Sequence, residues 1–129
     1  METLEFILYV SNQARSTVFY EKLLGIAPSL NVPGMTEFPL LPNVKLGLMP
    51  ESGIAKIISP GMPHPETGNG IPRCEVYLKL KDPETYLDRA VTLGGKIISP
   101  LYPRNWGDTV GYLADLDGHV IAFAKTSYN

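Results

Sequence analysis

Apolar and polar positions alternate along residues 4–10, LEFILYV. A period of two places successive side chains on opposite faces of a strand. One face is wholly apolar and is expected to pack on the core: Leu4, Phe6, Leu8 and Val10. The other face is mixed and carries Glu5, Ile7 and Tyr9. We therefore predict a strand that turns one face to the core and the other to a partly polar surface.

A helix and three further strands are predicted after this strand. Apolar residues recur at helical spacing over residues 14–24, with Ser11 or Asn12 at the N-cap and Gly25 at the C-cap. The strands are predicted in APSLNV, TEFPLL and VKLGLM. Residues 51–72, which follow, are rich in proline and glycine. This composition predicts a long irregular connection.

The same plan then begins again. CEVYLKL alternates, Asp82 and Pro83 open a second helical pattern, and KIISPL, TVGYLADL and HVIAFAK follow as strands. A shift of 70 residues places Glu5 on Glu75 and Gly25 on Gly95. We predict an α+β fold of two βαβββ modules in a single domain, residues 1–129. Module one spans about residues 1–50, the connector 51–72 and module two 73–129.

Composition narrows the classes of partner. The 129 residues carry a net charge of −2 and contain no basic tract, so a nucleic-acid partner is not expected. No apolar run reaches the roughly 20 residues of a membrane span. The first residues lack the basic start and long apolar stretch of a secretory signal, and Cys74 is the only cysteine. A cytoplasmic protein without a membrane anchor is predicted.

The mixed faces of the predicted strands indicate a binding surface. They combine carboxylates, tyrosines and small residues, which is too polar for a core and too apolar for a solvated face. Two curved sheets presenting such faces would line a cleft for a small molecule. The expected ligand contacts are Glu5, Tyr9, Glu75, Tyr77, Trp106 and Ala122.

Two stretches carry a family resemblance. LYVSNQARSTVFYEKLLGI resembles the first strand and helix of the vicinal oxygen chelate superfamily, which includes glyoxalase I, bleomycin-resistance proteins and extradiol dioxygenases. WGDTVGYLADLDGHVIAFA is similar to the C-terminal signature of that superfamily. The resemblance implies paired βαβββ modules that form a U-shaped mixed-sheet cleft, commonly completed by a homodimer.

The resemblance also implies where a metal would be held. Metal-dependent members place four ligands on strands, and these positions fall on Glu5, Glu75, Ala122 and a position near Gly47. Glycine and alanine have no side-chain donor, so we expect no metal or other cofactor. A weak divalent-metal site on Glu5 and Glu75, with water completing the coordination shell, remains open.

Three functions stay open at this point. The favoured hypothesis is a small-molecule-binding protein that sequesters a cationic aromatic compound. Two carboxylates about 4 Å apart repel by roughly 4 kcal/mol at a dielectric constant near 20, and a bound cation would relieve this repulsion. In the simpler alternative, Glu5 and Glu75 lie exposed at strand ends and pair with Lys or Arg. The other functions are a divalent-metal-dependent lyase, isomerase or dioxygenase, and a dimeric interaction module with a vestigial cleft.

Overall fold

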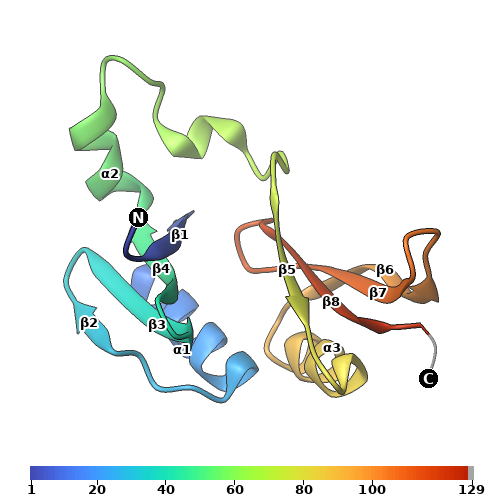
Figure 1. Ribbon diagram of the computed structural model, residues 1–129. Helices are drawn as coiled ribbons and strands as arrows, with labels where there is room; N and C mark the ends of the chain where they lie inside the picture. The colour runs from blue at the N-terminus through green and yellow to red at the C-terminus, as the bar shows by residue number, and fades with distance from the viewer. Residues whose placement is uncertain (128–129) are drawn as a thin grey trace. The chain divides into compact units, whose positions relative to one another are not determined.

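The computed structural model describes residues 1–127, so the last two residues of the predicted second module lie outside it. The chain divides into two compact units, residues 1–69 and 70–129. Within residues 1–127, each unit contains one four-stranded mixed sheet with a helix packed against it (Figure 1). The predicted α+β fold with two βαβββ repeats is confirmed.

The first unit is built from β1 to β4 and α1. Its elements are β1 (Leu4–Val10), α1 (Gln13–Leu24), β2 (Leu30–Val32), β3 (Met35–Leu41) and β4 (Val44–Pro50). The strand order is β1-β4-β3-β2, and β1 runs parallel to β4. The Asn12 side chain caps α1 by accepting the Arg15 N–H at 3.0 Å. Gly25 ends the helix at φ 67°, a conformation that glycine adopts without strain.

The core of the first unit uses only part of the predicted apolar face. Leu8 and Val10 are buried, together with Leu46 and Leu48 of β4. Leu4 and Phe6 are exposed, so their predicted place in the core is wrong. They lie in the first half of β1, which is an edge strand with a hydrogen-bonded neighbour on one side only. Alternation identifies a face, but only packing decides how much of it is covered.

The predicted irregular connection is also partly wrong. Residues Glu51–Ile58 form α2, and Pro65–Gly68 form the short 3₁₀ helix η1. Ile54 and Ala55 of α2 are buried, and α2 packs against β4 and β1. The prolines at 50 and 60 flank this helix and leave its hydrogen bonds intact. The many prolines and glycines around α2 therefore favoured a loop in the sequence-based prediction, although packing against the sheet stabilises a helix there.

The second unit repeats the topology of the first. Its elements are β5 (Glu75–Lys79), α3 (Pro83–Thr92), β6 (Lys96–Pro103), β7 (Asp108–Ala114) and β8 (Val120–Thr126). The strand order is β5-β8-β7-β6, and β5 runs parallel to β8. Since β5, β8, β7 and β6 match β1, β4, β3 and β2 in order and direction, the repeat predicted from the sequence is a repeat of topology.

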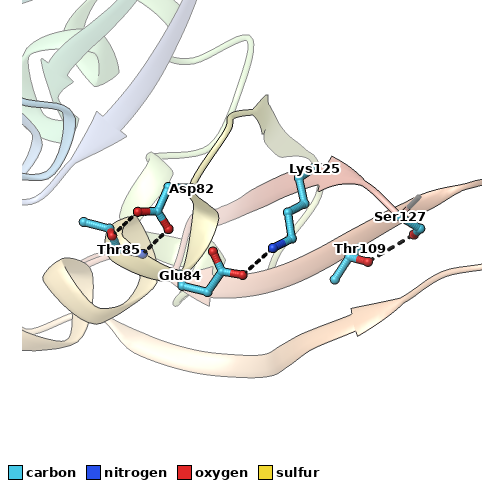
Figure 2. A network of polar contacts seen from close by, with 6 residues as sticks. All are labelled: Asp82, Glu84, Thr85, Thr109, Lys125 and Ser127. Carbon is cyan, nitrogen blue, oxygen red and sulfur yellow. Dashed lines mark hydrogen bonds and ion pairs between the residues drawn. The ribbon is translucent and has the colours of Figure 1, made fainter. Parts of the chain in front are cut away.

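Side-chain contacts fix α3 and β8 in place (Figure 2). Asp82 caps α3 by accepting the N–H and the hydroxyl of Thr85. Glu84, in the first turn of α3, forms an ion pair with Lys125 of β8 at 2.6 Å. At the other end of the view, the hydroxyls of Thr109 and Ser127 lie 3.0 Å apart. The Glu84–Lys125 pair holds the helix against one face of the sheet, and the Thr109–Ser127 contact joins β7 to the end of β8.

The two faces of β8 are both buried. Ile121 and Phe123 lie on the helix side, where the Phe123 ring is 5.6 Å from that of Tyr86 on α3. On the opposite face, Ala122, Ala124 and Val110 form a second buried cluster with Tyr112 packed against it. Among the described residues, no helix is long and apolar enough to span a membrane.

Candidate functional site

The first unit carries a cluster of Glu5, Glu37 and Lys45, called here the carboxyl cluster. The register pairs Glu5 with Lys45 across β1 and β4, and Gly47 with both Ile7 and Glu37. A Cβ placed on Gly47 would lie 2.4 Å from Glu5 Oε2. The missing side chain at Gly47 therefore lets the Glu5 carboxyl lie over β4, toward β3.

The carboxyl cluster is short of positive charge. Lys45 Nζ lies 3.4 Å from Glu37 Oε1, whose side chain is 16% exposed. Glu5 Oε2 is buried and has no hydrogen-bond donor among the described residues. Burial raises the pKa of Glu5, the hydrogen bond that a protonated Glu5 can share with Glu37 raises it further, as does the negative charge of Glu37, and Lys45 acts in the opposite direction. Two carboxyls can share a hydrogen bond only if one holds a proton, so the cluster binds a proton more readily than a lone glutamate.

The raised pKa of Glu5 predicts a specific pH dependence of stability. Because the folded state holds this proton more tightly, the stabilisation is complete below the ordinary pKa of 4.5 and is lost as pH rises through the folded value. Glu5→Gln imitates the protonated side chain, so its stability relative to the wild type should increase from acid to neutral pH. Urea unfolding of both proteins at several pH values measures this difference in the free energy of unfolding. Carboxyl groups that titrate alike in both proteins contribute equally and cancel in the difference. A constant difference across the range would show that Glu5 titrates normally.

The second unit carries a hydrogen-bonded cluster of Tyr77, Lys79, Trp106 and Asp108, called here the tyrosine cluster. The Tyr77 hydroxyl donates to Asp108 Oδ2 at 2.6 Å and accepts from Trp106 Nε1 at 3.1 Å. Lys79 Nζ lies 3.0 Å from Asp108 Oδ1. Residues from β5, β7 and the turn between β6 and β7 thus meet on the sheet face away from α3.

The hydrogen bonds set the charge states of the tyrosine cluster. The Tyr77 hydroxyl and then the Lys79 ammonium lower the pKa of Asp108, which keeps its carboxyl ionised. Burial and then the bond to Asp108 raise the pKa of Tyr77, although the Trp106 N–H acts in the opposite direction. Tyr77 is therefore a neutral phenol beside a carboxylate.

Arg104 holds the turn that carries Trp106. Its Nη2 donates to Ser99 Oγ, to the Pro100 carbonyl and to the Val110 carbonyl at 3.0, 3.1 and 2.9 Å. Its guanidinium also lies over the rings of Tyr112 and Tyr102, at 5.2 and 5.8 Å. These contacts join β6 to β7 beside the register shift between Ser99 and Tyr102. Arg104 consequently acts on the position of the indole rather than as a surface charge.

The predicted ligand residues have different surroundings. Tyr77 and Trp106 are brought together, and their side chains are 39% and 56% exposed. Ala122 is fully buried beneath this face, so it supports the site from below. Glu75 is exposed at the start of β5, and Tyr9 is partly buried on β1. Glu5 and Glu75 belong to different units, and their predicted convergence on one hollow stays a prediction.

Several residues of the two clusters were missed by sequence reasoning. Glu37 lies in a strand that was predicted, but its nearness to Glu5 depends on the register of β3 against β4. Asp108 follows Trp-Gly in the quoted C-terminal signature, and this proximity was a usable signal. Lys79 shares the alternating face of Tyr77, which also pointed to it. Lys45 shares the alternating face of Gly47, and Arg104 lies two residues before Trp106, so each of them also had a signal in the sequence.

The residues at the implied metal positions do not fit a four-ligand site. The side chains of Gly47 and Ala122 supply no metal-donor atom, and Ala122 is fully buried. Among residues 1–127, no group of three or more His, Cys, Asp or Glu side chains could hold a metal ion. Glu5 and Glu75 alone are a poor match for a transition-metal site. Lys45, which pairs with Glu37 beside Glu5, adds a positive charge that a metal ion would have to displace. That the protein works without a metal stays a prediction.

Comparison with known proteins decides the family. The pattern of the Glyoxalase/Bleomycin resistance protein/Dioxygenase superfamily matches residues 3–123. The chain belongs to this superfamily. No curated protein matched the chain.

Several solved structures share the fold of this chain. A glyoxalase-related enzyme from Fulvimarina pelagi has a TM-score of 0.81 at 18% identity, with 98% of this chain and 88% of that chain covered. A glyoxalase/bleomycin resistance protein/dioxygenase from Nocardioides has a TM-score of 0.73 at 23% identity, covering 98% and 83%. TioX from Micromonospora sp. ML1 has a TM-score of 0.73 at 17% identity, covering 98% and 99%. At these identities, the likeness establishes the fold and leaves the ligand to the chemistry of the site.

Proposed function

We propose that this member of the glyoxalase/bleomycin resistance superfamily binds and sequesters a cationic aromatic small molecule. The observation that carries the proposal is the carboxyl cluster, in which Glu5 Oε2 is buried without a donor beside Glu37. A homodimer and a cytoplasmic location, both expected from the sequence, are parts of the same proposal.

Charge supports a cationic ligand. With both glutamates ionised, the cluster holds two negative charges against the single positive charge of Lys45. An ammonium or ring cation can take the place of the proton that Glu5 otherwise holds, because it supplies the missing charge without a covalent step. Partial burial of the cluster strengthens this attraction relative to a solvated ion pair.

The second unit, considered by itself, presents aromatic surface that suits a flat ligand. Trp106 is more than half exposed, and the indole is already oriented by its bond to Tyr77. An indole face attracts a cationic ring within about 6 Å by about 0.5–2 kcal/mol. A fixed aromatic surface loses little conformational entropy when a flat ligand binds to it.

The charge states favour binding over acid–base chemistry. Asp108 is a weak base because its pKa is lowered, and Tyr77 is a weak acid because its pKa is raised. General acid–base catalysis is most effective when the pKa lies near the working pH, and both groups are shifted away from it. A binding role requires neither group to exchange a proton.

The experiment compares two flat probes that differ in charge alone, N-methylquinolinium and methylnaphthalene. Thermal shift and calorimetry report their binding. The cationic probe should bind more tightly, and the preference should weaken at acid pH as Glu5 takes up its proton. Equal binding of the two probes would contradict the proposal. Metal analysis of the purified protein serves as a second arm, since a tight stoichiometric divalent ion would favour the metal-dependent enzyme instead.

A further inference from the structure

The direction of each hydrogen bond in the tyrosine cluster follows from chemistry. The Trp106 Nε1–H can only donate, and an ionised Asp108 can only accept. The Tyr77 hydroxyl lies between them, at 3.1 Å from the indole nitrogen and 2.6 Å from the carboxylate. Its single proton therefore points to Asp108, and its oxygen faces the indole N–H.

This arrangement leaves acceptors and no free donor at the phenol. The Tyr77 oxygen has accepted one hydrogen bond and keeps one lone pair. Asp108 accepts from Tyr77 on one oxygen and from Lys79 on the other, and its side chain is 13% exposed. The indole N–H is already used by Tyr77. A ligand group that meets Tyr77 must then be a donor, because an acceptor would place lone pair against lone pair.

We infer that the tyrosine cluster selects ligands that present an N–H or O–H donor at the edge of a ring stacked on Trp106. The inference goes beyond the proposed function, since it concerns a surface of the second unit alone and defines the hydrogen-bonding pattern of a ligand that binds there. Lys79 is the one donor in the cluster with N–H groups to spare, and its side chain is 54% exposed. Recognition by Lys79 would favour acceptor ligands and is therefore the opposite outcome in the test.

The support beneath the cluster keeps its hydrogen bonds in place. Ala122, Ala124 and Val110 are fully buried, so the side chains above them rest on a closed surface. Arg104 is directed to Ser99, Pro100 and Val110, which keeps its Nη2 donors away from Tyr77. The acceptor is thus held in position before any ligand arrives, and binding requires little rearrangement.

The test uses two cationic probes of equal charge. One is an aminoquinolinium with N–H groups, and the other is its fully N-methylated analogue. Trp106 fluorescence and calorimetry measure both affinities on the full chain. We expect the N–H probe to bind about tenfold more tightly, the discrimination that one hydrogen bond provides. A preference for the methylated probe, or for an acceptor-bearing ring, would overturn the inference.

Two variants and one control variant locate the preference. Tyr77→Phe should reduce it to about twofold or less, whereas Tyr102→Phe, on β6 at the opposite edge of the same sheet, should keep it. In Asp108→Asn, Lys79 orients the amide oxygen toward itself, so the amide NH₂ faces Tyr77 and frees the phenol proton. This variant should lose the N–H preference and gain affinity for an acceptor-bearing ring. It is isosteric, and it carries the test by itself if Tyr77→Phe unfolds.

The outcomes separate this inference from the proposed function. Equal binding of the two cationic probes, with binding of N-methylquinolinium retained, overturns the donor requirement and leaves cation sequestration standing. An unchanged preference in Asp108→Asn likewise overturns it. Failure of every cationic probe to bind the wild-type protein overturns both.

Discussion

Phe123→Ala is expected to destabilise the protein by about 3–5 kcal/mol, the range found when a large buried aromatic side chain is removed. Phe123 has no exposed surface and lies on a strand with hydrogen-bonded neighbours on both sides. Its ring meets Tyr86 on α3, so the cavity would open between helix and sheet. Because a domain of this size is stable by only about 5–15 kcal/mol, a large part of the total is lost.

Urea unfolding followed by Trp106 fluorescence measures this loss, since the reporter lies in the same unit as Phe123. Phe123→Leu fills more of the cavity and should cost less. Ile98→Ala, at an exposed position of β6, should change stability by about 0.5 kcal/mol or less. A loss below about 1 kcal/mol for Phe123→Ala would mean that the unit repacks around the missing ring.

The double change Glu5→Gln with Glu37→Gln should abolish the preference for the cationic probe. The change removes the charge–charge attraction between the carboxylates and the cation, which lies between about 1 and 4 kcal/mol at contact distance, so affinity for N-methylquinolinium should fall roughly tenfold to a hundredfold. Methylnaphthalene should bind as before, because the change removes charge and little volume. Titrations with both probes at neutral pH measure the effect.

Three matched variants define which feature of the carboxyl cluster matters. Glu21→Gln removes an exposed charge on α1 and should leave the preference unchanged. Gly47→Ala keeps every charge but displaces the Glu5 carboxyl, because its Cβ would stand 2.4 Å from Oε2, and it should weaken the preference. Glu75→Gln tests the residue that the sequence paired with Glu5. A preference that survives the double change but disappears with Glu75→Gln would refute the carboxyl cluster as the cation site.

Much of the fold could be predicted because its signals are local. A period of two identified β1 and β5, helical spacing with caps identified α1 and α3, and glycines marked the ends of helices. The helix α2 was missed because its eight residues lie among prolines and glycines, and its stability comes from Ile54 and Ala55 packing on the sheet. A short helix held by tertiary contacts leaves a weak local signal.

The site was predictable to a smaller extent. Tyr77 and Trp106 were singled out separately, and the structure joins them through a hydrogen bond that no spacing in the sequence encodes. Their charged partner Asp108 was not recognised as part of a site. Glu5 was expected to meet a second carboxylate, and the one beside it is Glu37, a residue on another strand of the same sheet.

The sequence by itself determined the doubled βαβββ plan, the face on which each side chain of β1 and β5 lies, and the absence of donor atoms at Gly47 and Ala122. These properties depend on local backbone geometry and on residue type. Only the tertiary structure decided which residues are neighbours, namely Glu5 with Glu37 and Tyr77 with Asp108. Neighbours across a sheet are set by strand order and register, which bring together residues more than 30 positions apart in the chain and are fixed by packing of the whole unit.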